Sequence, residues 1–349
     1  MSSLLLHKIV RRAAFDIGSG STKIQCSDCE LIIDSSINSV VGCTILNVLF
    51  SGERPVPFGA DWMSSVDGNL SHEMQERGLA VITQLKSEAA ALGVTQMSAI
   101  ATEVFRKASN GQSYLDRVIA LGIPVQMLTQ ELEAELAYGS VMVSLGASDI
   151  STVWDSGGAS FQISSIDPRS RKIRAYMGSL GTGVTTGILM REIQQKEFNL
   201  SGSPNPVSLQ EYAQFSESLK AKLGAVPDWI QDCELVAASG GLNSMFAVCC
   251  DVLQRIAIDS NNGEVQPPIK EFSVDDAFTA LQACLDKSDA DLIKFVNFEF
   301  SDGEKVIVPK LSLLYTVMRH ANIKRIKTVA VVGSCAGLLK DVRFWDSSF

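Results

Sequence analysis

Two small-residue turns, each headed by an aspartate at the end of an apolar run, are the first candidates for chemistry in this sequence. The first reads FDIGSGSTK and begins at Asp16, and the second reads WDSGGASFQ and begins at Asp155. Backbone N–H groups in such turns can form a concave nest that binds phosphate, and small residues let a ligand approach closely. We expect the two aspartates to hold a hydrated Mg²⁺ ion between them, since carboxylate and phosphate oxygens are its usual ligands.

The predicted phosphate-binding residues lie in these two turns and in two further glycine turns, SLGTG and SGGLN. One such turn most often closes a hairpin, but four of them favour phosphate binding. Lys23, on the far arm of the first hairpin, either adds a positive charge to the site or is a solvated residue at a strand edge. The full set is Gly18, Ser19, Gly20, Ser21, Lys23, Gly157, Gly158, Ala159, Ser160, Gly181, Gly240 and Gly241.

The length and composition indicate a globular protein of two domains. At 349 residues the chain exceeds what one hydrophobic core usually supports, and 46% hydrophobic with 20% charged residues is ordinary for a well-developed interior. The formal net charge of −9 provides no general attraction for nucleic acid or for an anionic membrane surface. We therefore expect neither as a partner, and we expect an anionic ligand to be short and bound by local features.

The cysteines favour a reduced protein. The eight cysteines are irregularly spaced and no secretory leader is recognisable, so a cytoplasmic location is expected. Cys26 and Cys29 form one C-x-x-C pair without a second pair, which favours two ordinary thiols over a zinc site. No stretch approaches the ~20 apolar residues that a transmembrane helix requires.

The second half of the sequence repeats the pattern of the first. STVWDSGGASFQISSID is again a strand, an acid-headed turn and an alternating strand, about 140 residues after FDIGSGSTKIQCSD. The repetition predicts a duplicated α/β domain, with domain I at residues 1–129 and domain II at residues 130–349. The last residues could cross back onto domain I.

Three local predictions accompany this division. The segment LIIDSSI, residues 31–37, is expected to supply a third strand beside the first hairpin. Residues 294–309 are expected to form a hairpin with an Asp-Gly turn. Thr129 is predicted to cap the N-terminus of the helix that follows it.

In their order, these motifs resemble those of the exopolyphosphatase/guanosine pentaphosphate phosphohydrolase (Ppx/GppA) family. FDIGSGSTK is similar to the family's DxGSNSxR opening, ATEVFRKASN to ATxAxRxAxN, TQELEAEL to SGxEEARL, and DSGGAS to DIGGGS. The closing segment from Pro309 to Leu339 is similar to the family's last helix, strand and glycine turn. The resemblance runs from about Ala13 to Leu339.

This resemblance implies an α/β fold of two actin-like (ribonuclease H-like) domains, each a mixed five-stranded sheet flanked by helices, with a cleft between the domains. It also implies removal of a terminal phosphate from inorganic polyphosphate or a nucleotide 5′-triphosphate. The family's water-positioning glutamate falls on Glu133, and its second acid on Asp155, which would hold Mg²⁺ with Asp16. Arg106 would contact a phosphate bidentately, and a homodimer is expected as in other members.

Each of these roles has a structural alternative. Glu131, Glu133 and Glu135 lie at a helix start, where carboxylates are favoured by the helix dipole alone. Arg106 could instead pair with Glu103 on an exposed helix turn. The basic run from Arg169 to Arg174 is expected to be a solvated hairpin turn, with a docking site for a polyanion as the lesser alternative.

Several positions differ from the family's pattern. They are Gly20, Thr129, Gln130, Leu132, Glu135, Ala159 and Gln162. Gln162 lacks the charge of the acid that usually stands there, which would weaken metal binding. Glu135 replaces an arginine and adds negative charge where a polyanion must bind.

Three functions follow, from different classes. The first is a Mg²⁺-dependent phosphatase that acts on the terminal phosphate of short polyphosphate or a guanosine pentaphosphate-like nucleotide. The second is a catalytically weak sensor that binds these ligands. The third is a small-molecule kinase of the same actin-like ATPase superfamily, because DIGSGSTK also resembles the opening loop of such kinases.

Overall fold

The computed structural model describes residues 5–37, 39–146, 148–199, 202–231, 233–241, 243–260, 267–295 and 303–345, which form two compact units. The first unit comprises the described residues up to Ser144 and those from Val331 onward, and the second runs from Leu145 to Ala330. The sequence-based boundary after residue 129 lies before helix α5 (Gln130–Leu145), whereas the division by packing follows this helix. The reason is that Leu136 of α5 belongs to a hydrophobic cluster of the first unit.

The first unit contains a mixed five-stranded sheet in the order β3-β2-β1-β4-β5. The pairs β1–β2 and β2–β3 are antiparallel, and β1, β4 and β5 run parallel. The strands are β1 (Leu5–Ile17), β2 (Ser21–Asp34), β3 (Ser39–Pro55), β4 (Gln96–Ala101) and β5 (Val125–Met127). The prediction of a separate strand at 31–37 was wrong, because Leu31 to Asp34 continue β2.

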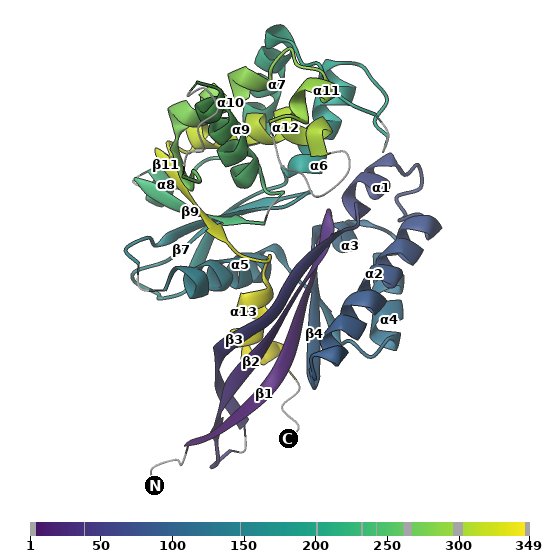
Figure 1. Cartoon of the computed structure of the whole chain (residues 1–349), viewed down its shortest axis with the longest axis vertical. Helices are drawn as coiled ribbons and strands as arrows, with labels where there is room; N and C mark the ends of the chain where they lie inside the picture. The colour runs from purple at the N-terminus through teal and green to yellow at the C-terminus, as the bar shows by residue number, and fades with distance from the viewer. Residues whose placement is uncertain are drawn as a thin grey trace. The chain divides into compact units, whose positions relative to one another are not determined.

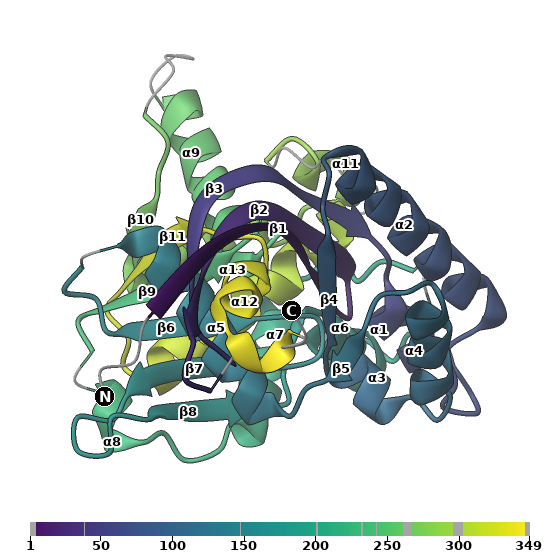
Figure 2. The same ribbon diagram turned by 90° about the horizontal axis from the view of Figure 1, so that it is seen from below.

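Helices cover both faces of this sheet, since β1 has buried residues on each side. Ala13, Phe15 and Ile17 face one cluster, while Ala14 faces the other. The helices are α1 (Phe58–Ser64), α2 (His72–Ala91), α3 (Glu103–Lys107), α4 (Gly111–Ala120), α5, α13 (Cys335–Lys340) and the 3₁₀ turn η3 (Val342–Phe344). α2 and α4 lie on one side of the sheet and α13 on the other (Figure 1; Figure 2).

Helices α5 and α13 approach each other closely. The N–H of Gly337 donates to Oγ of Ser140 at 2.7 Å, and a Cβ added at Gly337 would lie 2.1 Å from the carbonyl oxygen of Leu136. Glycine is therefore required at residue 337, because any side chain would push the two helices apart.

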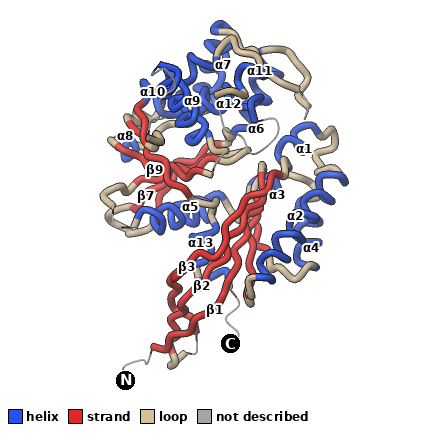
Figure 3. Tube along the Cα trace, viewed as in Figure 1, coloured by secondary structure: helices blue, strands red, loops and turns tan. Residues whose placement is uncertain are grey.

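The second unit contains a mixed sheet of six strands in the order β10-β11-β9-β6-β7-β8. The strands are β6 (Thr152–Ser156), β7 (Phe161–Ile166), β8 (Ile173–Gly178), β9 (Leu235–Gly240), β10 (Glu271–Ser273) and β11 (Arg325–Ala330). Five strands were predicted, and the additional one is β10, which pairs antiparallel with β11 at the edge. Strands of both units are red in Figure 3.

The helices of the second unit pack around a single large cluster that includes Trp154, Phe215, Phe246 and Leu314. They are α6 (Thr182–Ile188), the π-helical turn η1 (Leu189–Ile193), α7 (Leu209–Lys222), α8 (Asp228–Gln231), α9 (Met245–Ser260), α10 (Val274–Cys284), α11 (Asp289–Leu292), the 3₁₀ turn η2 (Gly303–Val306) and α12 (Ile307–His320).

The predicted hairpin over 294–309 is wrong in its second arm. Residues 303–309 form η2 and the first turn of α12, while 296–302 lie outside the described residues. Val306, Ile307 and Val308 favour a strand locally, but Ile307 and Val308 are fully buried as part of α12. Pro309 is compatible with this, because a proline is tolerated in the first turn of a helix.

The two sheets repeat one arrangement, as the sequence predicted. Each begins with a three-stranded antiparallel meander, β1-β2-β3 or β6-β7-β8, and adds parallel strands beside the first, β4-β5 or β9-β11. In each, a helix follows the third strand, α1 or α6. Within the described ranges, no helix combines the length and apolarity needed to cross a membrane.

Candidate active site

Three predicted catalytic or metal-binding residues lie at one edge of the first sheet. In the parallel register, Asp16 of β1 pairs with Ile100 of β4, and Ala101 of β4 pairs with Met127 of β5. Arg106 follows β4 on α3, and Glu133 follows β5 on α5. In open α/β sheets, ligands usually bind at the carboxyl ends of the parallel strands.

The first glycine-serine turn is held in place by its own backbone and by α1. The N–H of Gly18 donates to the carbonyl of Ser21 at 3.0 Å, which closes the hairpin. The N–H of Gly59 donates to the carbonyl of Ser19 at 2.7 Å, and that of Val56 to Gly20 at 3.1 Å. The Gly18 amide is thus used within the turn, so phosphate contacts predicted here depend on the other amides.

Asp16 is oriented by a turn that the sequence analysis did not include in the site. Its carboxylate is buried, and Oδ2 accepts a 2.9 Å hydrogen bond from the N–H of Ser334. Gly333 has a φ of +52°, and a Cβ there would lie 2.1 Å from the same oxygen. The small-residue run GSCAG at 333–337 was the signal that could have identified this turn.

Lys23 lies between two carboxylates in the register of the sheet. It pairs with Asp16 on β1 and with Glu53 on β3. Glu53 also accepts a 2.6 Å hydrogen bond from Oγ of Ser21 in the first glycine-serine turn. The sequence analysis predicts no strand over residues 39–55, so it does not identify Glu53 beside Lys23.

Arg106 and Glu133 form an ion pair. Both terminal nitrogens of Arg106 lie 3.3 Å from Oε2 of Glu133, and one also donates to the carbonyl of Leu128. Glu133 is 8% exposed, so it does not belong to a solvated helix start. The alternative partner of Arg106 was wrong, since Glu103 pairs with Lys107.

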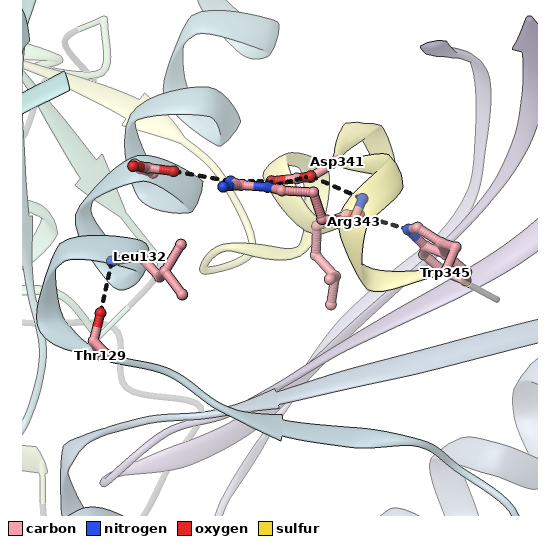
Figure 4. Close-up of polar contacts among 7 residues, drawn as sticks. Thr129, Leu132, Asp341, Arg343 and Trp345 are labelled. Carbon is pink, nitrogen blue, oxygen red and sulfur yellow. Dashed lines mark hydrogen bonds and ion pairs between the residues drawn. The ribbon is translucent and has the colours of Figure 1, made fainter. Parts of the chain in front are cut away.

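Glu135, whose charge departs from the family's pattern, is neutralised by Arg343. A guanidinium nitrogen of Arg343 lies 2.8 Å from Oε2 of Glu135 and also contacts Asp341 (Figure 4). These carboxylates raise the pKa of Arg343 above its ordinary value. Near the start of α5, Oγ1 of Thr129 accepts a 3.4 Å hydrogen bond from the N–H of Leu132, which confirms the predicted cap (Figure 4).

The second acid-headed turn has the same internal geometry as the first. The N–H of Gly157 donates to the carbonyl of Ser160 at 2.9 Å, and Asp155 pairs with Gln162 where Asp16 pairs with Lys23. The first turn of α6 contacts this loop, because the N–H groups of Thr182 and Gly183 donate to the carbonyls of Gly157 and Gly158. Helix α1 makes the equivalent contact in the first unit.

Gly181 is fixed against the second turn. A Cβ there would lie 2.3 Å from the backbone nitrogen of Ala159 and 2.6 Å from the carbonyl oxygen of Gly157. SLGTG therefore lies directly on the loop, and glycine is required for the close approach.

The third glycine turn of the second unit follows β9, the parallel neighbour of β6. Val153 and Trp154 pair with Ala237 and Ala238, so Gly240 and Gly241 lie at the same sheet edge as Asp155. The buried Lys310 donates from Nζ to the carbonyl of Asn243 at 2.6 Å and supports this turn. Leu242 of the motif lies outside the described residues.

The structure thus groups the predicted residues by unit. Asp16, Arg106, Glu133 and the first turn belong to the first unit, while Asp155 and the remaining glycines belong to the second. In the part of the chain that the structure describes, no three His, Cys, Asp or Glu side chains are grouped to hold a metal ion. The joint binding of Mg²⁺ by Asp16 and Asp155, and the cleft, stay predictions.

Comparison with known proteins agrees with the resemblance seen in the sequence. Residues 32–201 match the model of the Ppx/GppA phosphatase family. The predicted family resemblance is confirmed by this match.

Solved structures agree with the fold over nearly the whole chain. A Ppx/GppA enzyme from Aquifex aeolicus is 19% identical, with a TM-score of 0.66 over 95% of this chain and 99% of that one. An exopolyphosphatase from Cytophaga hutchinsonii is 15% identical, with a TM-score of 0.68 over 94% and 96%. Nucleoside triphosphate hydrolases from Neospora caninum give 12% and 0.55 over 97% and 93%. The predicted fold of two actin-like units is confirmed.

Proposed function

We propose that this chain, which matches the Ppx/GppA phosphatase family over residues 32–201, is a Mg²⁺-dependent phosphohydrolase. Its substrate is short inorganic polyphosphate or a guanosine pentaphosphate-like nucleotide, from which it removes the terminal phosphate. The family match supports a phosphatase acting on polyphosphate or nucleotide. The net charge of −9 favours short ligands over long polyanionic chains.

The ion pair between Arg106 and Glu133 is the observation that carries this proposal. A largely buried carboxylate is costly unless a cation or hydrogen bonds compensate it. Ionisable groups held in such surroundings cluster at functional sites, and this pair lies at the carboxyl ends of the parallel strands. Asp16 lies along the same edge.

Phosphoryl transfer requires positioned water, neutralised phosphate oxygens and a metal ion, and no covalent nucleophile. In the proposed mechanism, Glu133 orients the attacking water and accepts its proton. Arg106 holds the Glu133 carboxylate and contacts a phosphate oxygen of the bound substrate.

The donor set suits Mg²⁺. This ion is commonly bound by one or two carboxylates, with waters and substrate phosphates completing its shell. Asp16 and Asp155 are the proposed ligands, and the hydrogen bond from Ser334 holds the Asp16 carboxylate in one orientation. The ion would neutralise charge on the phosphate oxygens.

Phosphate release from short polyphosphate, guanosine pentaphosphate and ATP tests the proposal, with and without Mg²⁺. We expect Glu133→Gln to reduce release by at least about 100-fold. Glu131→Gln is the matched control, because Glu131 lies on the same helix turn but is exposed. Release that survives unchanged in Glu133→Gln would contradict the mechanism.

Two other outcomes distinguish the rival functions. Binding of these ligands without release would identify a sensor. Transfer of phosphate to a sugar or carboxylic acid acceptor would identify a kinase.

A further inference from the structure

Two cysteines and an arginine form a buried cluster on the face of the first sheet that α13 covers. Cys29 lies on β2 and Cys43 on β3, and both belong to one hydrophobic cluster with Leu338 and Trp345. Leu31 pairs with Cys43, and Cys29 pairs with Ile45, so the two cysteines are diagonal neighbours on one face. Sγ of Cys29 donates to the carbonyl of Ser27 at 3.9 Å.

Arg12 of β1 points into the same cluster and is only 1% exposed. Its Nε donates to Oε1 of Gln96 at 2.8 Å, its guanidinium stacks 4.2 Å from the ring centre of Trp345, and a terminal nitrogen lies 3.8 Å from Sγ of Cys43. Within the described residues, none of these partners is a carboxylate. A buried cation is costly without a counter-charge, and the thiol groups are the adjacent groups that can supply one.

The surrounding groups determine which of the two sulfur atoms carries the negative charge. The neighbouring thiol of Cys29, with Arg12 and Lys340 nearby, lowers the pKa of Cys43 despite its burial. The neighbouring Cys43, together with burial and Asp28, raises the pKa of Cys29. Cys43, which lies next to the Arg12 guanidinium, is therefore the more acidic of the two thiols.

Cys26 provides an internal comparison. It lies three residues before Cys29 but on the other face of the sheet, in the cluster with Phe15 and Met74. Burial raises its pKa to about 11. Because the two cysteines of the C-x-x-C pair face opposite sides, they cannot bind one metal ion, and all eight cysteines are free thiols.

We propose that the Arg12-paired thiolate of Cys43 and the thiol of Cys29 form an oxidation site for hydrogen peroxide. The thiolate of Cys43 attacks one peroxide oxygen, the O–O bond breaks, and Cys43 sulfenic acid and hydroxide form, the latter taking a proton from solvent. The sulfur of Cys29 then attacks that of Cys43, the S–O bond breaks, and the Cys29 proton leaves with the hydroxyl as water. Overall, two thiols and one peroxide give one disulfide and two waters.

A disulfide between Cys29 and Cys43 requires a small movement of the strands. Diagonal Cα atoms on neighbouring strands are ~7–8 Å apart, slightly beyond the usual range for a disulfide. β3 is an edge strand with register shifts against β2 near both cysteines, so a small movement of β3 can close this gap. Cys43 is buried, with 7% of its surface exposed.

Graded hydrogen peroxide treatment of the full-length protein, followed by alkylation in denaturant and peptide mass spectrometry, tests this site. We expect a Cys29–Cys43 disulfide, with oxidation of Cys43 at least about tenfold faster than that of Cys26. Oxidation of Cys43 no faster than Cys26 would overturn the proposal. Accumulation of Cys43 sulfinic acid with Cys29 still free would also overturn it.

Thiolate absorbance at 240 nm between pH 5 and 9 provides a second measurement that does not depend on oxidation. The wild-type protein and Cys26→Ser should show an ionisation step that Cys43→Ser lacks. In Arg12→Lys the step should persist, and in Arg12→Met it should move to higher pH, with circular dichroism checking that the variant is folded. A step that survives Cys43→Ser would refute the thiolate assignment, whatever the Arg12 variants do.

Discussion

The backbone N–H of Ser334 donates a 2.9 Å hydrogen bond to Oδ2 of Asp16, although the two residues are 318 positions apart. The turn at Gly333 and Ser334 follows β11 of the second unit and belongs to the first. The carboxylate at the end of the first strand is therefore oriented by the returning chain.

This contact predicts that Gly333→Ala will reduce phosphate release. The new Cβ would lie 2.1 Å from Oδ2 of Asp16, and Gly333 has a left-handed φ of +52° that disfavours alanine. We expect at least a tenfold loss of kcat and a loss of about 1–3 kcal/mol in the free energy of unfolding. Steady-state kinetics and urea unfolding measure these two effects.

Gly224→Ala is the matched control for Gly333→Ala. Nothing lies within 4 Å of a Cβ added at Gly224, and its φ lies outside the left-handed range. Wild-type kinetics in Gly333→Ala would show that the turn does not position Asp16.

The ion pair between Arg106 and Glu133 predicts a measurable coupling energy. Arg106→Met leaves a buried carboxylate without this partner, which should cost about 3 kcal/mol in the free energy of unfolding. In Arg106→Met/Glu133→Gln much of that loss should be recovered, giving a coupling of about 1–3 kcal/mol. Urea unfolding of the four proteins in the double-mutant cycle measures it.

An exposed ion pair on α7 provides the control for this double-mutant cycle. Lys220 and Glu217 are ion-paired on the surface of α7, and Lys220→Met should change stability by less than about 0.5 kcal/mol. A coupling between Arg106 and Glu133 as small as that would mean that the pair is solvated.

Local patterns in the sequence were enough to predict the parts of the site built from neighbouring residues. The acid-headed turns repeat because each is one strand, one turn and one strand, and both hairpins have the predicted form. The cap at Thr129 also follows from the local motif.

The contacts that sequence reasoning missed join residues far apart in the chain or depend on tertiary packing. Ser334 with Asp16 and Arg343 with Glu135 are separated by 318 and 208 positions, and no local pattern links such pairs. The run EKVIVP has the composition of a strand, but burial of Ile307 and Val308 stabilises it as a helix start.

The contact between Arg343 and Glu135 predicts a salt-dependent effect on substrate binding. In Arg343→Met the carboxylates of Glu135 and Asp341 lose their cation, which adds negative charge on the unit that carries Glu133. We expect KM for an anionic substrate to rise a few-fold at low ionic strength and to approach the wild-type value near 0.5 M salt, where charges are screened.

Stability should change little in Arg343→Met, because the Arg343 side chain is half exposed. Arg255→Met is the control, since Arg255 forms an exposed pair with Asp259 on α9. An increase in KM that does not depend on salt would contradict the electrostatic explanation.

The raised pKa of Asp251, on α9, predicts that replacing this residue with asparagine increases stability in a pH-dependent way. Burial raises its pKa to about 6, so the folded state holds the proton more tightly than the unfolded state. Well below 3.8, the ordinary pKa of aspartate, the group is protonated in both states and costs nothing. As pH rises through 6 the penalty develops fully, because the charged form remains in a partly buried place.

Asp251→Asn should therefore change the free energy of unfolding only slightly at pH 4 and raise it at pH 7.5. Partial exposure of the group reduces the expected gain to about 1 kcal/mol. Thermal or urea unfolding at the two pH values measures this difference. The control is Asp259→Asn, on the same helix but exposed, which should change stability by less than about 0.5 kcal/mol at both pH values. An equal gain for Asp251→Asn at pH 4 would mean that packing, and not ionisation, is responsible.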